Sequence, residues 1–317
     1  MSFLGFCFID LFMDKAKRIR DVLPWLEQAI TKCELCPRAC KVNRKNGELG
    51  FCKTGVQAQV ASFDLHFGEE RILVGQGGSG TIFFAHCNLG CVFCQNYEIS
   101  NNDLNFPEVS AKQLALIMLE LQTKGAENIN LVTPSHVALA ILQALDLALA
   151  QGLNLPVVYN TSSYDSPYLI SKLEGIVDIY LADLKFFSSQ YAQKYTQAPD
   201  YPQLAQTNVL RMYEQVGGIK LNAREVAQKG LIIRHLILPN DLGQTQEWLE
   251  FLHANKLYDV YLNLMDQYHP AHKAHLYPEL QAGIDYKTLD HYVQMAKKMG
   301  FKYIDQPKQR LFRLLSW

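Results

Sequence analysis

The chain has 317 residues, 49% of them hydrophobic, and its 30 basic residues nearly balance 31 acidic ones. This length fits one large α/β domain, or a domain with an appendage, whose core needs no disulfide staples. The net charge of −1 gives no general reason to expect nucleic acid or a membrane as a partner. All eight cysteines lie in the first third of the chain, which indicates metal chemistry in a reducing cytosol rather than a secreted disulfide scaffold.

The first twelve residues, MSFLGFCFIDLF, are apolar but shorter than the ~20 residues needed to span a bilayer. They lack a basic start and include Asp10, which argues against a signal peptide. Met13 opens an ordinary amphipathic segment. Two alternatives stay open: translation starts at Met13, or it starts at Met1 and residues 1–12 belong to an N-terminal helix packed on the main domain.

Four cysteines follow in a loop-rich stretch, CELCPRACKVNRKNGELGFC, with the spacing C-x2-C-x3-C-x11-C. Cys33, Cys36, Cys40 and Cys52 could close a structural zinc site, hold a second iron–sulfur cluster, or be reduced thiols in a small subdomain. We expect residues 1–60 to form an N-terminal helix with this cysteine-rich segment. Residues 61–317 form the main domain.

Residues 56–74 alternate in polarity and predict a β-hairpin. The run from Gly75 to Gly80 then matches G-x-G-x-x-G by letter. A dinucleotide fingerprint needs a strand before it and a helix after it, whereas here a strand-like run, residues 81–86, follows. We therefore reject the nucleotide interpretation and expect these glycines to turn the chain tightly into that strand.

Strand-like and helix-like segments alternate from there to the end of the chain. The predicted strands are 81–86, 128–132, 155–160, 177–186, 230–238 and 259–265. The predicted helices are 111–125, 137–152, 165–173, 188–228, 245–255 and 286–300. This alternation predicts an α/β fold with a parallel sheet. Six units are too few to close an eight-stranded barrel, so we expect an open partial (β/α)6 barrel with its site at the carboxyl ends of the strands.

Three cysteines, Cys87, Cys91 and Cys94, follow the first of these strands with the spacing C-x3-C-x2-C. Soft thiolates suit an iron–sulfur cluster or zinc. A four-iron cluster usually takes four cysteines, so three would leave one iron open to a substrate. From the residues alone, a structural zinc loop and a cluster with a distant fourth ligand remain alternatives.

The triplet after the first strand resembles the signature of radical S-adenosylmethionine (radical SAM) enzymes. Residues 33–40, CELCPRAC, resemble the start of a subfamily of iron–sulfur proteins related to pyruvate formate-lyase activating enzyme. The resemblance covers roughly residues 33–270. It implies the partial barrel fold, a [4Fe-4S] cluster on the three cysteines, and SAM bound at the open iron.

The resemblance also implies cofactor contacts at the other strand ends. Thr133 and Ser135 stand where the family usually has a glycine-rich segment that binds the methionine amine, and this sequence departs from that pattern. The other residues implied in binding SAM are Phe93, Asn160, Thr161, Asp183, Lys185, Arg234 and His269.

The residues themselves, independent of the resemblance, indicate which way some of these side chains point. Strand alternation places Asp183 and Lys185 on one face, toward the barrel interior, with a merely structural ion pair as the alternative. Arg234 in an apolar strand needs a partner, and the carboxylate of SAM would be one. His235 faces the opposite way and is expected to pack.

The activity implied by the resemblance is that of an oxidoreductase. It cleaves SAM reductively, and the resulting 5′-deoxyadenosyl radical takes a hydrogen atom, here from a backbone glycine of a glycyl radical enzyme. Reduced flavodoxin or ferredoxin would be the electron donor. Two rivals stay open: radical chemistry on a small molecule or another macromolecule, and a non-catalytic metal-binding or electron-relay protein.

Overall fold

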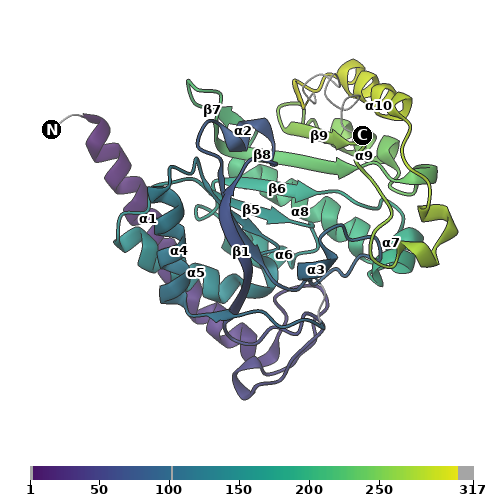
Figure 1. The fold of residues 1–317 in the computed structure, drawn as a ribbon. Helices are drawn as coiled ribbons and strands as arrows, with labels where there is room; N and C mark the ends of the chain where they lie inside the picture. Colours follow the sequence, from purple (N-terminus) through teal and green to yellow (C-terminus); the bar gives the residue numbers. More distant parts are fainter. Residues whose placement is uncertain (1–2, 101–102, 306–317) are drawn as a thin grey trace.

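A computed structural model of the protein describes residues 3–100 and 103–305 (Figure 1). Its centre is one sheet with the strand order β10-β9-β8-β6-β5-β4-β2-β1-β3. Seven neighbouring strands run parallel: β2 (Ser79–Phe84), β4 (Ile129–Val132), β5 (Val157–Thr161), β6 (Ile179–Asp183), β8 (Ala227–Leu236), β9 (Tyr261–Met265) and β10 (Tyr303–Ile304). The sheet does not return on itself, so the predicted open, partial barrel is confirmed.

Two antiparallel strands extend the sheet beyond β2. They are β1 (Ala58–His66), which pairs with β2, and β3 (Glu108–Val109), which pairs with β1. A third short strand, β7 (Lys220–Leu221), pairs antiparallel with β8. The parallel part of the sheet therefore has an antiparallel edge on the side from which the cysteine loop leaves.

Helices connect successive parallel strands, as the alternation predicts. They are α4 (Ala111–Thr123), α5 (Ala138–Ala150), α6 (Pro167–Lys172), α7 (Ser189–Thr196), α8 (Tyr201–Val216), α9 (Thr245–Ala254) and α10 (Tyr286–Lys298). Helix α4 shows the local rules: Ser110 and Gln113 form a capping box at its start. Leu114, Met118 and Leu121, spaced four and three apart, bury its inner side.

The expected hairpin over 56–74 is wrong in its second half. Residues 71–74 form a helical turn, α2 (Arg71–Val74), and the antiparallel partner of β1 is β2. Ile72 and Leu73 pack with Val158 and Ile232 in one buried apolar cluster. The conformation of residues 71–74 therefore follows the packing of their apolar side chains rather than their β-like composition.

The expected helix over 188–228 is also wrong in extent. It divides into α7 and α8, and α8 ends at Val216 because Gly217 adopts φ +72°. The next glycine, Gly218, leaves no room for a side chain, since a Cβ there would lie 2.2 Å from the carboxyl carbon of Asp259. The chain then turns back through β7 into β8, which begins three residues earlier than predicted.

The glycine run before β2 turns the chain as expected, and Gly77 adds a close approach. A Cβ at Gly77 would lie 1.9 Å from the carbonyl oxygen of Gly125, so only glycine fits against that backbone. Gly78, at φ +84°, supplies a left-handed turn. Together these residues bring the chain directly into β2.

The N-terminal part is a long helix, α1 (Phe3–Ala29), that lies along α5 (Figure 1). Lys15 pairs with Asp178 at 2.5 Å, and Arg20 pairs with Asp146 on α5 at 3.0 Å. The cysteine-rich segment follows as loops with two short 3-10 turns, η1 (Ile30–Lys32) and η2 (Arg44–Asn46). Within the described residues, no helix is both long and apolar enough to cross a bilayer.

Candidate active site

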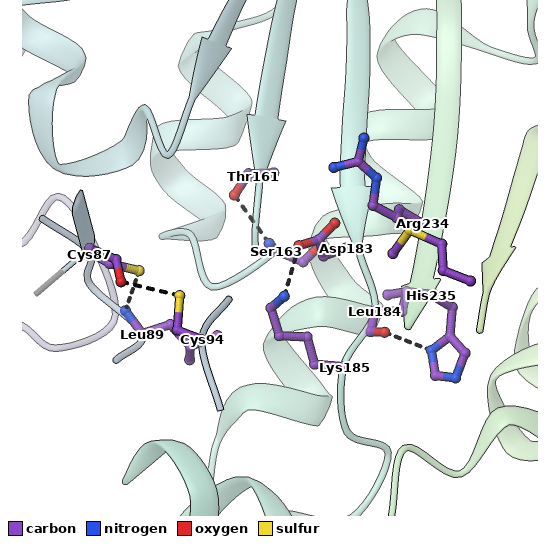
Figure 2. Close-up of polar contacts among 12 residues, drawn as sticks. Cys87, Leu89, Cys94, Thr161, Ser163, Asp183, Leu184, Lys185, Arg234 and His235 are labelled. Carbon is purple, nitrogen blue, oxygen red and sulfur yellow. Dashed lines mark hydrogen bonds and ion pairs between the residues drawn. The ribbon is translucent and has the colours of Figure 1, made fainter. Parts of the chain in front are cut away.

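A cavity of about 640 Å³ opens at the carboxyl ends of the parallel strands. The thiols of Cys87, Cys91 and Cys94 line it on one side. The carboxyl ends of the strands line it on the other side, namely those of β4, β5, β6, β8 and β9. Figure 2 shows Asp183 and Lys185 across from Cys87 and Cys94. The predicted location of the site, at the carboxyl edge of the sheet, is therefore where the structure has its cavity.

The loop of residues 87–94, here called the cluster loop, is held by hydrogen bonds along its length. The Leu89 N–H donates to the sulfur of Cys87 at 3.3 Å, and the Ser100 hydroxyl donates to the sulfur of Cys94 at 3.2 Å. Backbone bonds tie Val92 to two other segments, from its N–H to Tyr195 and from the Lys273 N–H to its carbonyl. Donors aimed at sulfur favour the thiolate, the form that binds metal.

Burial raises the pKa of the Cys91 thiol, while the ammonium of Lys185 acts in the opposite direction. Burial also raises the pKa of Cys87, opposed by the backbone N–H groups of Gly90 and Leu89. Thiols in this setting favour their neutral form unless a cation binds them.

In the part of the chain that the structure describes, no three Cys, His, Asp or Glu side chains are grouped as a site for one metal ion. A four-iron cluster makes a different demand, because each cysteine binds a different iron and the three sulfurs stand apart. The donor set that lines the cavity, three thiols with N–H and O–H donors beside them, therefore fits a cluster in its chemistry.

Asp183 and Lys185 lie opposite the thiols, at the end of β6. The Lys185 ammonium is 2.8 Å from Oδ2 of Asp183. The second oxygen, Oδ1, is buried and has no hydrogen-bond partner among the described residues. Burial alone would lower the pKa of Lys185, but the Asp183 carboxylate, together with the nearby Cys91 and Tyr201, holds that pKa above its ordinary value. The wall thus offers a fixed cation and an unsatisfied anionic acceptor, which suits a zwitterionic amino acid group.

The ends of β4 and β5 contribute three of the four residues expected there. Thr133, at φ +59°, Asn160 and Thr161 line the cavity. Ser135 is buried outside the lining, and its hydroxyl hydrogen-bonds to Asp165. The structure therefore does not bring Ser135 to the cofactor side of the loop.

Sequence reasoning missed Asp165, whose buried carboxylate hydrogen-bonds to residues at the ends of both β4 and β5. This buried carboxylate accepts from the Thr161 hydroxyl at 2.6 Å and from the Tyr159 hydroxyl at 3.0 Å, as well as from Ser135. Burial raises its pKa, and the three hydroxyl donors act against that. No spacing in the sequence singles out this aspartate, because its partners come from three separate positions.

Arg234 on β8 lines the cavity, and its partners within the chain are two glutamates rather than a bound carboxylate. Glu70 faces it with two hydrogen bonds, at 2.9 Å to Nε and 2.7 Å to Nη2. Glu69 accepts a third, at 2.8 Å, and Asn263 on β9 also donates to Glu70. Burial would raise the pKa of Glu70, but Arg234 outweighs it and the pKa is lowered.

Phe93, His269 and His235 complete the predicted set. Phe93 lines the cavity and packs edge-on against Phe186. His269 is exposed outside the lining and hydrogen-bonds through Nδ1 to the side chain of Gln95, which does line it. His235 points away from the cavity, as expected, and donates from Nδ1 to the Leu184 carbonyl at 2.7 Å (Figure 2).

The second cysteine group lies in the N-terminal segment. Cys33, Cys36 and Cys52 are buried and Cys40 is half-buried. The Phe51 N–H donates to the sulfur of Cys40 at 3.3 Å. Burial raises the pKa of Cys36 to about 12, and the nearby Cys52 and Cys33 act in the same direction. For this group of four cysteines, the three alternatives of a zinc site, a second cluster or free thiols stay predictions.

Comparison with known proteins relates the chain to a protein of similar sequence and to a solved structure of similar fold. No family model matches the chain. The "Uncharacterized protein MJ0674" of Methanocaldococcus jannaschii is 31% identical over 313 residues, which cover 96% of this chain and 86% of the relative. A crystal structure of a radical SAM methyltransferase from Sphaerobacter thermophilus matches with a TM-score of 0.50 and 12% identity, over 73% of this chain and 67% of that one. The chain therefore has the fold that this methyltransferase has.

Proposed function

This chain belongs to the same family as the uncharacterized protein MJ0674 of Methanocaldococcus jannaschii, and we propose that it is a radical SAM enzyme. One observation carries the proposal. Three cysteines, with no fourth among the described lining residues, face a cavity whose opposite wall holds an unsatisfied carboxylate oxygen and a lysine. A three-thiol cluster leaves one iron open, and an amino acid group can occupy it.

In this proposal, five of the lining residues would bind the cluster or SAM directly. Cys87, Cys91 and Cys94 would hold a [4Fe-4S] cluster, which would supply the electron for reductive cleavage of the SAM sulfonium. Oδ1 of Asp183 would accept a hydrogen bond from an N–H of the SAM amino group. Lys185 has three donors, so it can hold Asp183 and the SAM carboxylate at once.

Three further lining residues would position the cofactor. Asn160 offers its side-chain amide, whereas the Thr161 hydroxyl is already bound to Asp165 and to the Ser163 N–H. Phe93 supplies an apolar surface for the adenine. Thr133 presents its backbone at a strand end in a left-handed conformation, which aims its carbonyl differently from a regular strand residue.

The substrate we propose is a backbone glycine of a glycyl radical enzyme, with reduced flavodoxin or ferredoxin as the electron donor. The resemblance of Asp183-Leu184-Lys185 and of the β8 arginine to activating enzymes supports this. Chemistry on a small molecule is the second candidate, because the cavity volume lies within the range of small-molecule sites.

The test is SAM cleavage by anaerobically reconstituted protein supplied with a strong reductant. We expect 5′-deoxyadenosine and methionine from the wild type and neither from the Cys87→Ala, Cys91→Ala double variant. Iron-loaded wild type that leaves SAM intact would refute the radical SAM proposal and favour an electron-relay protein.

The substrate is tested separately by isotope transfer. A glycyl radical enzyme labelled with deuterium at glycine Cα should pass deuterium into 5′-deoxyadenosine. Cleavage without any transfer from the labelled protein would contradict the activator role and leave the small-molecule candidate.

A further inference from the structure

We propose that Arg38, in the cysteine-rich segment, is a positioning residue that holds the cluster loop in its metal-binding shape. Its importance for catalysis rests on the proposed function, whereas the contact itself does not. Arg38 lies outside the cavity lining and was not among the residues expected at the site. It would act through the backbone of the loop rather than on SAM or the cluster.

The Arg38 guanidinium binds four backbone carbonyls in two segments. It donates to Asn88 at 2.9 Å from Nε and to Leu89 at 2.9 Å from Nη2, both between the first two cysteines of the cluster loop. It also donates to Thr196 at 2.7 Å and to Gln197 at 2.6 Å. One planar cation therefore joins the cluster loop to the end of α7.

Helix polarity favours a cation at this point. Thr196 is the last residue of α7, and the carbonyls at a helix C-terminus carry partial negative charge. The same end of α7 receives the Val92 N–H of the cluster loop on the carbonyl of Tyr195, at 3.0 Å. The contacts of Arg38 and Val92 thus hold the loop against the helix on both sides of Cys91.

Aromatic rings cover the guanidinium. Its central carbon lies 4.0 Å from the ring centre of Phe51 and 5.3 Å from that of Tyr164. Phe51 also covers the loop, because a Cβ at Gly90, which has φ +68°, would lie 3.1 Å from its ring. Cation–π contacts and charge-assisted hydrogen bonds strengthen as water is excluded.

The loop needs such support because its backbone is not held by a regular ladder. His86 and Gly90 both have left-handed φ values, +69° and +68°. Asn88 and Leu89 are buried, so without Arg38 their carbonyls would lose charge-assisted partners and would have no ready replacement by water. The thiols on either side would then sample positions that do not suit a cluster.

Lysine cannot take the place of this arginine. Its compact ammonium has three donors and no plane, so it cannot span four carbonyls and stack between two rings. Arg38→Lys therefore keeps the positive charge but removes the planar guanidinium with its five donors, while Arg38→Met removes both the charge and the donors. Arg211→Met is the matched control, because Arg211 on α8 also donates to a backbone carbonyl, that of Pro167 at 3.1 Å, away from the cavity.

The experiment is amide hydrogen exchange on the full-length, metal-free protein, followed by the rate at which a chelator removes iron from the reconstituted protein. We expect exchange of residues 87–94 to be about ten-fold faster in Arg38→Met, with Arg38→Lys intermediate and Arg211→Met like the wild type. Iron release should follow the same order. If Arg38→Met does not fold, the Arg38→Lys comparison decides.

Exchange of residues 87–94 that stays at the wild-type rate would overturn the inference. So would a rise spread evenly over the chain, because that would mean general destabilisation. The readout is independent of SAM chemistry. If the wild type leaves SAM intact while the local exchange result holds, the proposed function fails and the role of Arg38 stands.

Discussion

Asp183 has two carboxylate oxygens in different situations. Oδ2 is bound to Lys185, whereas Oδ1 is buried and lacks a partner among the described residues. A buried acceptor without a donor costs free energy, and folded proteins seldom keep one without a functional reason. A donor from a ligand would satisfy it, and the N–H groups of the SAM amino group are the candidate.

Asp183→Asn should weaken SAM binding by about ten-fold or more, because hydrogen bonds to charged groups contribute roughly 1.5–3 kcal/mol. Equilibrium dialysis of SAM against anaerobically reconstituted protein measures this. Asp146→Asn, in an ion pair between α5 and α1, should bind SAM like the wild type. Equal affinity of the Asp183 variant and the wild type would exclude this contact.

The Arg234–Glu70 pair is predicted to stabilise the wall of the cavity. Glu70→Gln should lower the free energy of unfolding by about 3–5 kcal/mol, because it leaves a buried guanidinium without its main counter-charge. Chemical denaturation measures the loss, and the double variant Glu70→Gln, Arg234→Met should be less destabilised than Glu70→Gln alone. A loss below ~1 kcal/mol would contradict this, because it would mean that Glu69 and Asn263 stabilise the cavity wall without the charge of Glu70.

At the scale of single residues, the sequence could predict the inward face of each strand but not its internal partners. Alternation along β6 and β8 was enough to place Asp183 and Arg234 in the cavity and His235 outside it. Glu70 and Asp165 come from loops, where no periodicity indicates which way a side chain points. Their roles depend on tertiary contacts with residues 164 and 30 positions away.

Elements with strong periodicity could be predicted, and those defined by packing could not. Strand β5 and helix α9 lie within two residues of their expected bounds because apolar runs and turn signals agree there. The run at 71–74 includes β-like residues but is helical, and in this turn Ile72 and Leu73 pack with Val158 and Ile232. Strand β10 is two residues long and gives no usable pattern.

The two cysteine groups should respond differently to mutation. We expect the Cys87→Ala, Cys91→Ala pair to lose the cluster iron and SAM cleavage. The Cys33→Ala, Cys36→Ala pair should keep that iron, and its zinc content should not change, because the described cysteines of this segment are not grouped as a site for one metal ion. Metal and sulfide analysis of anaerobically purified protein measures both.

Loss of iron from the Cys33→Ala, Cys36→Ala pair would instead indicate a second cluster in this segment. Loss of about one zinc per chain would indicate a structural zinc site. Either result would contradict the prediction of packed thiols and leave the assignment of the first group intact.

For the whole molecule, stability should fall between pH 7 and pH 5. Burial lowers the pKa of His136 to about 3 and that of His235 to about 4. A histidine in the unfolded chain titrates near ~6.5, so below that pH the unfolded chain binds more protons than the folded one. Each histidine should therefore cost roughly 2 kcal/mol of stability at pH 5 relative to pH 7.

Urea denaturation of the wild type and of His235→Gln at both pH values measures this contribution. Glutamine can keep the bonds to Leu184 and Thr245 and does not titrate. The variant should show a smaller loss between pH 7 and pH 5. An identical loss in both proteins would assign the pH dependence to other groups.

The molecule as a whole brings its predicted site together because of topology rather than sequence proximity. Parallel strands joined by helices place every carboxyl end at one edge of the sheet, so Cys87, Asp183 and Arg234 line one cavity despite their separation in the chain. That arrangement follows from the strand–helix alternation. The contact between the cysteine-rich segment and the cluster loop does not follow from this alternation, because it depends on the geometry of the Arg38 side chain.

Mössbauer spectroscopy of iron-57 protein, with and without SAM, tests the central claim most directly. The account predicts a [4Fe-4S] cluster in which one of the four irons changes its spectrum when SAM is added. The change should be absent after Cys87→Ala with Cys91→Ala. Four irons that all keep their spectra in saturating SAM, or a tetrahedral metal bound only by protein side chains at these cysteines, would contradict it.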